Sequence, residues 1–525
     1  MRLLASILIL IAGISILSDR LNAANISSTV KTSIQRRVDY GYNPGIIIGV
    51  VDQSGRDFYA YGETSLGSQE LPNENTVYEI GSISKVFTTS LLADMIQQGD
   101  LQLDDSVQSF LPDDTSVPTR SGRSITLEHL ATHTSGLPVN QPDVATNNPV
   151  NPFFPFPATE LYDFLNTHQL SRTPGREFEY SNLGLGLLGH ALSNHLNTTF
   201  EDALTQRILE PLQLFDTVID PSPAQTSRRA QGYSGVVERP PFKMEVLGAA
   251  GQILSTANDM LTFIEHQLGL RQSNLSSAFE DAQTARVSAG APGQDVGLGW
   301  FIIAAGPDTI HMHDGATMGH NTMAGFNKAR NLGVVVLSNA RINQYSGVQD
   351  LGFRSLIPGF PLNPIRRPRT IAPEALEDYV GMFAETDGTS FTFEIAHDHL
   401  TAGFSEDQGV RFTLYPSRTD QFQLYEAAIT ATATFVRNTE DQVIAMDWEQ
   451  GDTTQRYVFA PESPSLHITS SAEGLHLSLE GRANTSGQIE QSEDLQAWSP
   501  FVTTRVGAEP IPIPSESPSR FFRLR

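Results

Sequence analysis

Strand-like segments stand at both ends of roughly the first 360 residues, and this placement constrains the fold more than any other feature of the chain. Residues 46–51 are apolar and are followed by a turn at 53–55 and a second strand-like run at 58–61. Two such runs around a short glycine turn predict an antiparallel hairpin. Further buried strands are expected at 297–303 and 333–337. Strands first, helices in the middle and strands last predict one α/β domain whose sheet joins both ends of this region.

Helical spacing dominates the part of the chain between these strands. Phe87, Leu91 and Met95 fall four residues apart within 82–98, which is typical of a helix with one apolar face. Gly99 then stands where the C-terminal cap of that helix is expected. Further helices are expected at 159–167, 183–196 and 200–208.

The composition changes near residue 364, where a Pro- and Arg-rich stretch at 364–369 is typical of a linker. The short strand candidates beyond it predict a small β-barrel-like domain over 372–461. After a second Pro-containing break, alternating leucines at 475, 477 and 479 predict a small β-sandwich-like domain over 464–525. The strand candidates of the first of these domains are 389–395, 410–414, 421–424, 431–436 and 456–459.

The composition also narrows the classes of function. The 525-residue chain has 34 Lys+Arg against 59 Asp+Glu, and this formal charge of −25 argues against a nucleic-acid binder, which must present a basic face to phosphates. The chain has no cysteine, so disulfides, thiolate metal sites and a cysteine nucleophile are excluded. We expect the acidic excess to form a solvated surface.

The first 24 residues have the pattern of a secretory signal peptide. Arg2 precedes an apolar run of 15 residues at 3–17, which is too short for a comfortable membrane span, and small residues follow at Ala23 and Ala24. No later stretch is long and apolar enough to cross a bilayer. We therefore expect a mature chain without a membrane span, located in the periplasm or outside the cell.

A Ser-x-x-Lys motif opens the helix expected at 82–98. Ser82 and Lys85 stand three residues apart, so a helix places them on one face, one turn from each other. A serine is a weak nucleophile until a base takes its proton, and a lysine whose pKa is lowered by burial can take it. The backbone N–H of Ser82 lies near a helix N-terminus, where donors are free for an oxyanion.

The same spacing occurs a second time, at Ser28 and Lys31. That copy lies just after the expected cleavage site, in a segment expected at the surface, so we assign it no catalytic role. Ser82, in contrast, follows Gly81 at the end of a strand expected at 76–80 and begins an apolar helix.

Two further short motifs carry groups suited to the same chemistry. Tyr180-Ser181-Asn182 is the only Tyr-x-Asn in the chain. A phenol near Ser and Lys can move protons, and an Asn can orient the base and a substrate amide. His313-Asp314-Gly315 precedes an expected strand, and its glycine would let a substrate backbone approach closely.

These three elements, in this order, resemble the serine β-lactamase and penicillin-binding family, specifically its class C type. That group includes D-alanyl-D-alanine carboxypeptidases, D-aminopeptidases and esterases. The resemblance extends over about residues 30–360, and it implies an α/β (α+β) β-lactamase-like domain over 25–362. In that fold an antiparallel sheet is flanked by helices and accompanied by a mostly helical region. The segments that carry the wider resemblance are 125–138, 174–182, 251–260 and 333–339.

The resemblance also implies a role for each motif residue. Ser82 is the nucleophile that becomes acylated, while Lys85 and Tyr180 share the general acid and base work, with the acylation base left open. The remaining implied roles concern substrate binding: Asn182 positions the substrate, His313 takes the third-motif place usually held by lysine, Gly315 lines the strand beside the acyl group, and the backbone N–H groups of Ser82 and Ala316 form the oxyanion hole.

The chain departs from the family pattern at two points. Gly319-His320-Asn321 stands where the family often has Gly-Gly and an aromatic residue. His313 replaces a lysine and titrates near neutrality when unperturbed. We therefore expect the anchoring of a substrate carboxylate to weaken as the pH rises.

The resemblance implies an exported serine hydrolase that hydrolyses the amide bond in β-lactams or D-Ala-containing peptides. The alternatives are a carboxylesterase of the same fold and a non-catalytic binding protein that retains the fold. We expect no cofactor and no metal site, although His129 and His133 stand four residues apart on an expected helix. The expected partner is a small-molecule or peptide substrate and not a nucleic acid, and the C-terminal β domains are candidates for binding a surface or partner.

Overall fold

The computed structural model divides into two units near residue 368, each described here by itself. The described residues are 25–142, 148, 150–341, 343–385, 388–404, 410–425, 430–460 and the strand segments 465–471, 474–480, 486–492, 499–505, 511–512 and 521–524. The signal peptide expected at 1–24 lies outside the described residues. The domain limits expected at residues 362, 372, 461 and 464 stay predictions.

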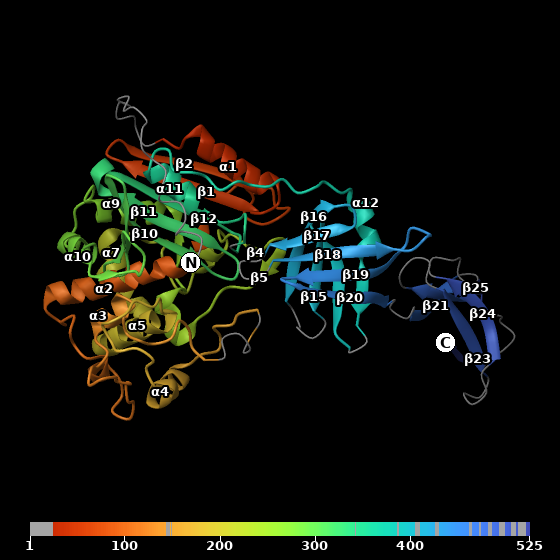
Figure 1. Cartoon of the computed structure of the whole chain (residues 1–525), viewed down its shortest axis with the longest axis horizontal. Coiled ribbons are helices and arrows are strands. Elements are labelled where there is room, and N and C mark those ends of the chain that lie inside the picture. Colours follow the sequence, from red (N-terminus) through yellow and green to blue (C-terminus); the bar gives the residue numbers. More distant parts are fainter. Residues whose placement is uncertain are drawn as a thin grey trace. The chain divides into compact units, whose positions relative to one another are not determined.

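An eight-stranded sheet forms the framework of the first unit, in the order β2-β1-β12-β11-β10-β9-β8-β7 (Figure 1). Its centre joins the two ends of the region, because β1 (Gly45–Asp52) pairs antiparallel with β12 (Leu332–Ser338). This confirms the sheet predicted from the sequence. The other strands are β2 (Gly55–Gly62), β7 (Val287–Ser288), β8 (Gln294–Val296), β9 (Phe301–Ala305), β10 (Asp308–Ala316) and β11 (Asn321–Asn327).

The strand expected at 297–303 is wrong in its first half. Gly297 N donates to Trp300 O at 2.9 Å, so these residues form a turn, and β9 begins only at Phe301. Gly299 within the turn has φ +76°, a backbone conformation that favours glycine. A run of apolar residues therefore concealed a turn that packs against a helix, where Thr89 lies close to Gly299.

Side chains of the central strands alternate between two cores, as the period of two requires. Ile47 and Val335 belong to the core that includes α9 (Ala257–Leu268). Their neighbours along the strands, such as Ile48, belong to a second core with α1 (Ser28–Asp39) and α11 (Gln349–Leu356). Both faces of the sheet are thus covered by helices, which holds its strands rigidly.

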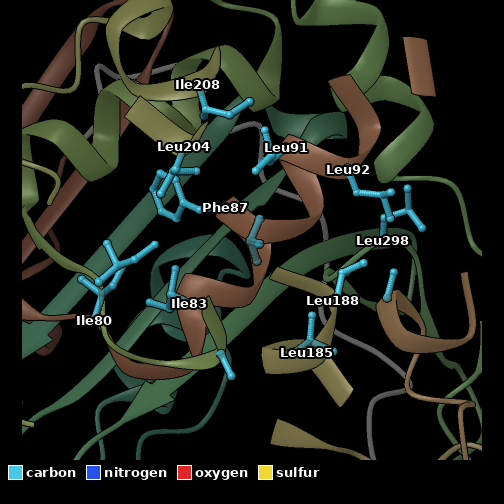
Figure 2. Close-up of a cluster of buried hydrophobic side chains, with 14 of the residues drawn as sticks. Ile80, Ile83, Phe87, Leu91, Leu92, Leu185, Leu188, Leu204, Ile208 and Leu298 are labelled. Atoms are coloured by element: carbon cyan, nitrogen blue, oxygen red, sulfur yellow. The ribbon is translucent and has the colours of Figure 1, made fainter. Parts of the chain in front are cut away.

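The helical region packs on α2 (Ser84–Gln98), which is buried along most of its length. Figure 2 shows Phe87 and Leu91 of this helix in a cluster with Leu185, Leu204 and Ile208. Gly99 caps the helix with φ +80°, as predicted. The other helices are α3 (Leu127–Ala131), α4 (Ala158–Thr167), α5 (Asn182–Leu196), α6 (Phe200–Leu204), the π-helical turn Thr205–Leu209, α7 (Glu210–Leu212), α8 (Pro223–Thr226) and α10 (Ser276–Ala282).

Two glycines bring α5 close to a 3₁₀ segment, Glu245–Ala250, that reaches the site described below. A Cβ at Gly186 would lie 2.4 Å from the Leu247 side chain, and one at Gly189 would lie 2.1 Å from the Ala249 side chain. The glycines in this helix therefore serve close packing. The remaining short strands of the unit are β3 (Val77–Glu79), β4 (Gly232–Ser234), β5 (Val237–Arg239) and β6 (Leu254–Thr256).

The second unit contains a closed eight-stranded barrel, β13 to β20, which confirms the small all-β fold. Its interior is filled by aromatic side chains, among them Phe383, Phe391, Phe393 and Phe435. A short helix, α12 (Pro373–Leu376), precedes the barrel. The strands of the barrel are β13 (Gly381–Ala384), β14 (Ser390–Ala396), β15 (His399–Phe404), β16 (Arg411–Arg418), β17 (Gln421–Tyr425), β18 (Thr430–Arg437), β19 (Val443–Gln450) and β20 (Thr453–Ala460).

Strands β13, β15 and β19 had no counterpart in the sequence prediction. β13 is only four residues long, and β15 and β19 carry polar residues that weaken the strand pattern. Beyond the barrel, the described strands form two three-stranded sheets, β21-β22-β25 and β24-β23-β26. Their bounds are β21 (Ser465–Ser471), β22 (Gly474–Glu480), β23 (Ser486–Ser492), β24 (Ser499–Arg505), β25 (Ile511–Pro512) and β26 (Phe521–Leu524).

Candidate active site

Ser82 sits on a tight turn between β3 and α2. The 3₁₀ turn Gly81–Ile83 runs directly into α2, so the backbone at Ser82 lies at the start of a continuous helical segment. Gly81 has φ +54°, and a Cβ there would lie 2.7 Å from the backbone N of Ala316. Only a glycine allows both this backbone conformation and this close approach.

Lys85 is wholly buried beside the Ser82 hydroxyl. Its Nζ lies 2.8 Å from Ser82 Oγ and donates to the carbonyl oxygen of Ala250 at 2.6 Å. Burial lowers the pKa of the Lys85 amine well below its ordinary value, and the Asp314 carboxylate opposes this effect. The amine thus lies within hydrogen-bond distance of the serine hydroxyl, and its lowered pKa favours the neutral form.

Tyr180 completes a cluster of three with these residues. Lys85 Nζ lies 4.9 Å from the centre of the Tyr180 ring, and the Ser82 side chain lies close enough to the phenol to affect its pKa. Burial raises the pKa of the Tyr180 phenol. The Ser82 side chain acts to lower this pKa, and the charge of Asp314 acts to raise it further. The phenol thus keeps its proton at neutral pH.

His133 holds the segment that carries Tyr180. It is buried, its ring centre lies 4.5 Å from that of Tyr180, and its Nδ1 accepts the backbone N–H of Ser181 at 3.0 Å. Burial lowers the pKa of His133, and the charge of Lys85 adds to this effect. Sequence reasoning considered this histidine only as half of a metal pair with His129, and no spacing signal pointed to its contact with Tyr180.

Asn182 is the first residue of α5, two positions after Tyr180. Its Nδ2 donates to Asn140 Oδ1 at 2.7 Å, and its backbone N–H donates to Val139 O at 2.7 Å. Ser181 caps the helix by accepting the N–H of Gly184. The cap fixes where the helix begins, and so orients the partly exposed Asn182 amide.

His313 lies on β10, buried, with its ring centre 6.3 Å from that of Tyr180. Its Nδ1 donates to the carbonyl oxygen of Asp314 at 2.6 Å, so in the neutral ring Nε2 is an acceptor. Burial and then the charge of Lys85 lower the pKa of His313 to about 4, while Asp314 opposes them. The expectation that this group titrates near neutrality is therefore wrong, and the ring is neutral at pH 7.

Gly315 packs against the backbone of Ile80. A Cβ at Gly315 would lie 2.0 Å from the carbonyl oxygen of Ile80, two residues before Ser82. The glycine thus allows β10 to touch the turn that carries the nucleophile. The next residue, Ala316, is exposed at the end of the strand and lies against Gly81. The backbone of Gly81, directly before Ser82, therefore packs against the backbone of Ala316.

His129 and His133 have separate partners. His129 Nδ1 accepts the backbone N–H of Thr126 in a capping box at the start of α3. Within the described ranges, no group of three or more His, Cys, Asp or Glu side chains is placed to hold a metal ion. Among these same residues, no helix has both the length and the apolar character needed to cross a membrane.

Comparison with known proteins shows the family to which the chain is similar. Residues 30–352 match the family model described as Beta-lactamase. The D-alanyl-D-alanine-carboxypeptidase/endopeptidase AmpH of Escherichia coli strain K12 is 31% identical over 328 residues, which cover 60% of this chain and 84% of that protein. A protein named Beta-lactamase from the same strain is 28% identical over 293 residues, or 54% of this chain and 73% of that protein.

Solved structures show the same likeness. The class C beta lactamase from Rhodobacter sphaeroides matches with a TM-score of 0.54 and 25% identity, over 61% of this chain and 96% of that one. The Beta-Lactamase/D-Alanine Carboxypeptidase from Pseudomonas syringae matches with a TM-score of 0.55 and 26% identity, over 63% of this chain and 98% of that one. Fold and relatives together define a serine hydrolase of the β-lactamase and D-Ala carboxypeptidase type. The chain belongs to the beta-lactamase family.

Proposed function

We propose that the chain hydrolyses the amide bond of D-Ala-containing peptides or β-lactams through an acyl-enzyme on Ser82. The observation that carries the proposal is the buried Lys85 amine, 2.8 Å from Ser82 Oγ. Lys85 Nζ takes the hydroxyl proton as Oγ attacks the substrate carbonyl, and the resulting oxyanion faces the N–H groups of Ser82 and Ala316.

Collapse of that intermediate breaks the C–N bond. The Tyr180 phenol gives its proton to the leaving amine and recovers one from the protonated Lys85. Water then attacks the ester on Ser82 by the reverse sequence of proton transfers, which releases the acid and restores the hydroxyl.

The directions of the pKa shifts of Lys85 and Tyr180 support the proposal that Lys85 is the base and Tyr180 the acid. The lowered pKa of the Lys85 amine favours the neutral form that a base needs. The raised pKa of the Tyr180 phenol favours the protonated form that an acid needs. Lys85 is therefore the proposed base of acylation, a point that the sequence alone left open.

The substrate class rests on the names of the relatives, which include D-alanyl-D-alanine-carboxypeptidase/endopeptidase and Beta-lactamase. The test exposes the wild type and Ser82→Ala to a D-Ala-D-Ala peptide, a chromogenic cephalosporin, a fluorescent penicillin and a short-chain nitrophenyl ester. Turnover that survives Ser82→Ala contradicts the mechanism. No reaction of the wild type with any of the four favours the binding-protein alternative.

A carboxylesterase is the second candidate, and His313 favours it. A neutral ring that presents Nε2 as an acceptor offers no positive charge to a substrate carboxylate at pH 7. Cationic anchoring by this residue is confined to pH values below about 4, where the ring is protonated. Esters without a carboxylate do not need such an anchor.

The His313→Lys variant distinguishes these substrate classes. A lysine at this position should lower the KM of an anionic substrate about tenfold. This corresponds to a gain of roughly 1.4 kcal/mol in the free energy of substrate binding. The KM of a neutral ester of the same acyl group should not change. An equal change for both substrates would show that this position does not select for charge.

The proposal includes export to the periplasm or the medium, on the basis of the apolar run at residues 3–17. N-terminal sequencing of the protein recovered from the periplasm or culture medium tests it. A mature chain that begins near residue 25 supports export, and a full-length chain retained in the cytoplasm contradicts it.

A further inference from the structure

A buried carboxylate stands three residues before the nucleophile. Glu79 is the last residue of β3 and is only 4% exposed. Its Oε1 accepts the backbone N–H of Phe242 at 2.8 Å and a guanidinium N–H of Arg229. Its Oε2 accepts the Thr317 hydroxyl and Nδ1–H of His320, the latter at 3.0 Å. Both oxygens are thus fully engaged.

Glu79 is ionised under working conditions. Burial acts to raise its pKa, but His320 and Arg229, together with the N–H of Phe242, lower it to about 2. Breaking a buried ion pair by removing one partner is far more costly than breaking an exposed one. A buried carboxylate with this many donors therefore holds its partners in fixed positions.

The partners on Oε2 both belong to the turn that follows the third motif. Thr317 is the residue after Ala316, and His320 ends the same turn. The turn is closed by Thr317 N–H, which donates to His320 O at 3.0 Å. The Thr317 hydroxyl oxygen also accepts the N–H groups of Gly319 and His320. Glu79 is thus hydrogen-bonded to the first and the last residue of this turn, Thr317 and His320.

This turn and the nucleophile turn touch through their backbones. A Cβ at Gly81 would fall 2.7 Å from the N of Ala316, and one at Gly315 would fall 2.0 Å from Ile80 O. Thr322 Oγ1 donates to Ile80 O at 2.9 Å. Because the two backbones lie this close, side chains that bond to both segments can set the distance between them.

We propose that Glu79, through Thr317 and His320, is a positioning residue that sets the spacing between the backbone N–H groups of Ser82 and Ala316. The inference rests on the proposed Ser82 mechanism and deepens it. It also gives a role to His320, which lies within the segment 319–321 that departs from the family pattern and contacts the Glu79 carboxylate.

The proposed effect on the oxyanion hole is tested by replacing the carbonyl oxygen of the substrate with sulfur and comparing the rates of the two substrates. An activated ester and its thionoester, in which C=S replaces C=O, differ at the atom that the two N–H groups receive. Correctly spaced donors favour the oxygen substrate, because sulfur is larger and a weaker acceptor. The ratio of the two kcat/KM values reports donor placement and is independent of the fraction of enzyme that is folded.

Thr317→Val removes the hydroxyl and keeps the side-chain shape, and Thr317→Ser keeps the hydroxyl. We expect Thr317→Val to lower kcat/KM for the oxygen ester by about 10- to 100-fold, somewhat less than outright loss of an oxyanion donor. The thionoester rate should fall much less, so that the ratio collapses, and Thr317→Ser should restore most of it. An unchanged ratio in Thr317→Val would overturn the proposal.

Glu79→Gln provides the second variant, with the same expected fall in the ratio. If it does not fold, the Thr317 pair alone decides. Ser82→Ala separates this inference from the proposed function. Ester hydrolysis that survives Ser82→Ala overturns both, whereas an inactive Ser82→Ala with an unchanged ratio in Thr317→Val overturns the positioning role alone.

Discussion

The chain contains the Ser-x-x-Lys spacing twice, and the two copies differ in almost everything except that spacing. Ser82 and Lys85 are joined side chain to side chain at 2.8 Å, with the lysine wholly buried. Ser28 begins α1 and is exposed, and Lys31 Nζ lies over the Tyr59 ring at 5.3 Å. An ammonium group over an aromatic face makes a favourable cation–π interaction.

The difference shows that the same spacing can lie in very different surroundings, and in the proposed mechanism burial is what suits the Lys85 amine to act as a base. Lys85 has lost its hydration and has gained two neutral acceptors, the Ser82 hydroxyl and the carbonyl of Ala250. That carbonyl comes from a segment that α5 approaches closely through its glycines. The chemistry of the motif therefore depends on a helix packing contact about 100 residues away in sequence. The following experiments test this contrast, from the largest expected effect to the smallest.

The serine substitutions should differ most. Ser82→Ala should lower kcat by roughly 10⁴-fold or more, because the covalent route is lost. Ser28→Ala should leave kcat within twofold. Steady-state hydrolysis of the nitrophenyl ester checks both, and a large loss in Ser28→Ala would mean that the contrast between the copies is false.

The lysine substitutions come next. Lys85→Met keeps the volume of the buried stem and removes the base, so kcat/KM should fall by about 10³-fold, within the range of general-base catalysis. Lys31→Met should have no effect on the same parameter. Full activity in Lys85→Met would transfer the role of base to another group.

Tyr180→Phe should show an effect that depends on the leaving group. An amine needs a proton to leave and nitrophenolate does not, so amide hydrolysis should fall about 100-fold while ester hydrolysis falls less. The two rates are measured on one preparation of the variant. Equal losses for both substrates would contradict the role of Tyr180 as the acid.

The smallest effect concerns stability. The pKa of Lys85 is lowered in the folded state, so between that value and the ordinary value the unfolded chain binds a proton that the folded protein does not. Stability should therefore rise with pH in this window, by up to about 1.4 kcal/mol per pH unit. Relative to Lys85→Met, the wild type should gain unfolding free energy from pH 7 to pH 9.

Urea unfolding at the two pH values measures this gain. Lys31→Met is the matched control and should retain the gain, because Lys85 is still present. A wild-type gain that persists in Lys85→Met would assign the effect to another group.

The sequence predicted the sheet, α2 and the three short motifs because their signals are local. Apolar runs mark β1 and β12, and residue identity marks Ser82 and Tyr180. It did not predict His133 beside Tyr180 or Glu79 beside Thr317. Those contacts join residues 47 and 238 positions apart, and no periodicity reports such a pairing.

The protonation state of His313 could not be predicted from the sequence, for a different reason. Its residue type was evident, but its charge depends on how deeply β10 is buried and on the nearby Lys85. Gly315 is similar, since its close contact turned out to be the Ile80 carbonyl. Local pattern thus predicts which residues gather at the site, and packing decides what each can do there.

The central claim is that Ser82 alone is activated. A fluorophosphonate probe, which reacts with activated serines whatever the natural substrate, tests it on the full chain by intact mass and peptide mapping. The account predicts one adduct, on the peptide containing Ser82, that is retained in Ser28→Ala and lost in Ser82→Ala and Lys85→Met. An adduct on Ser28, or labelling that persists in Ser82→Ala, would contradict it.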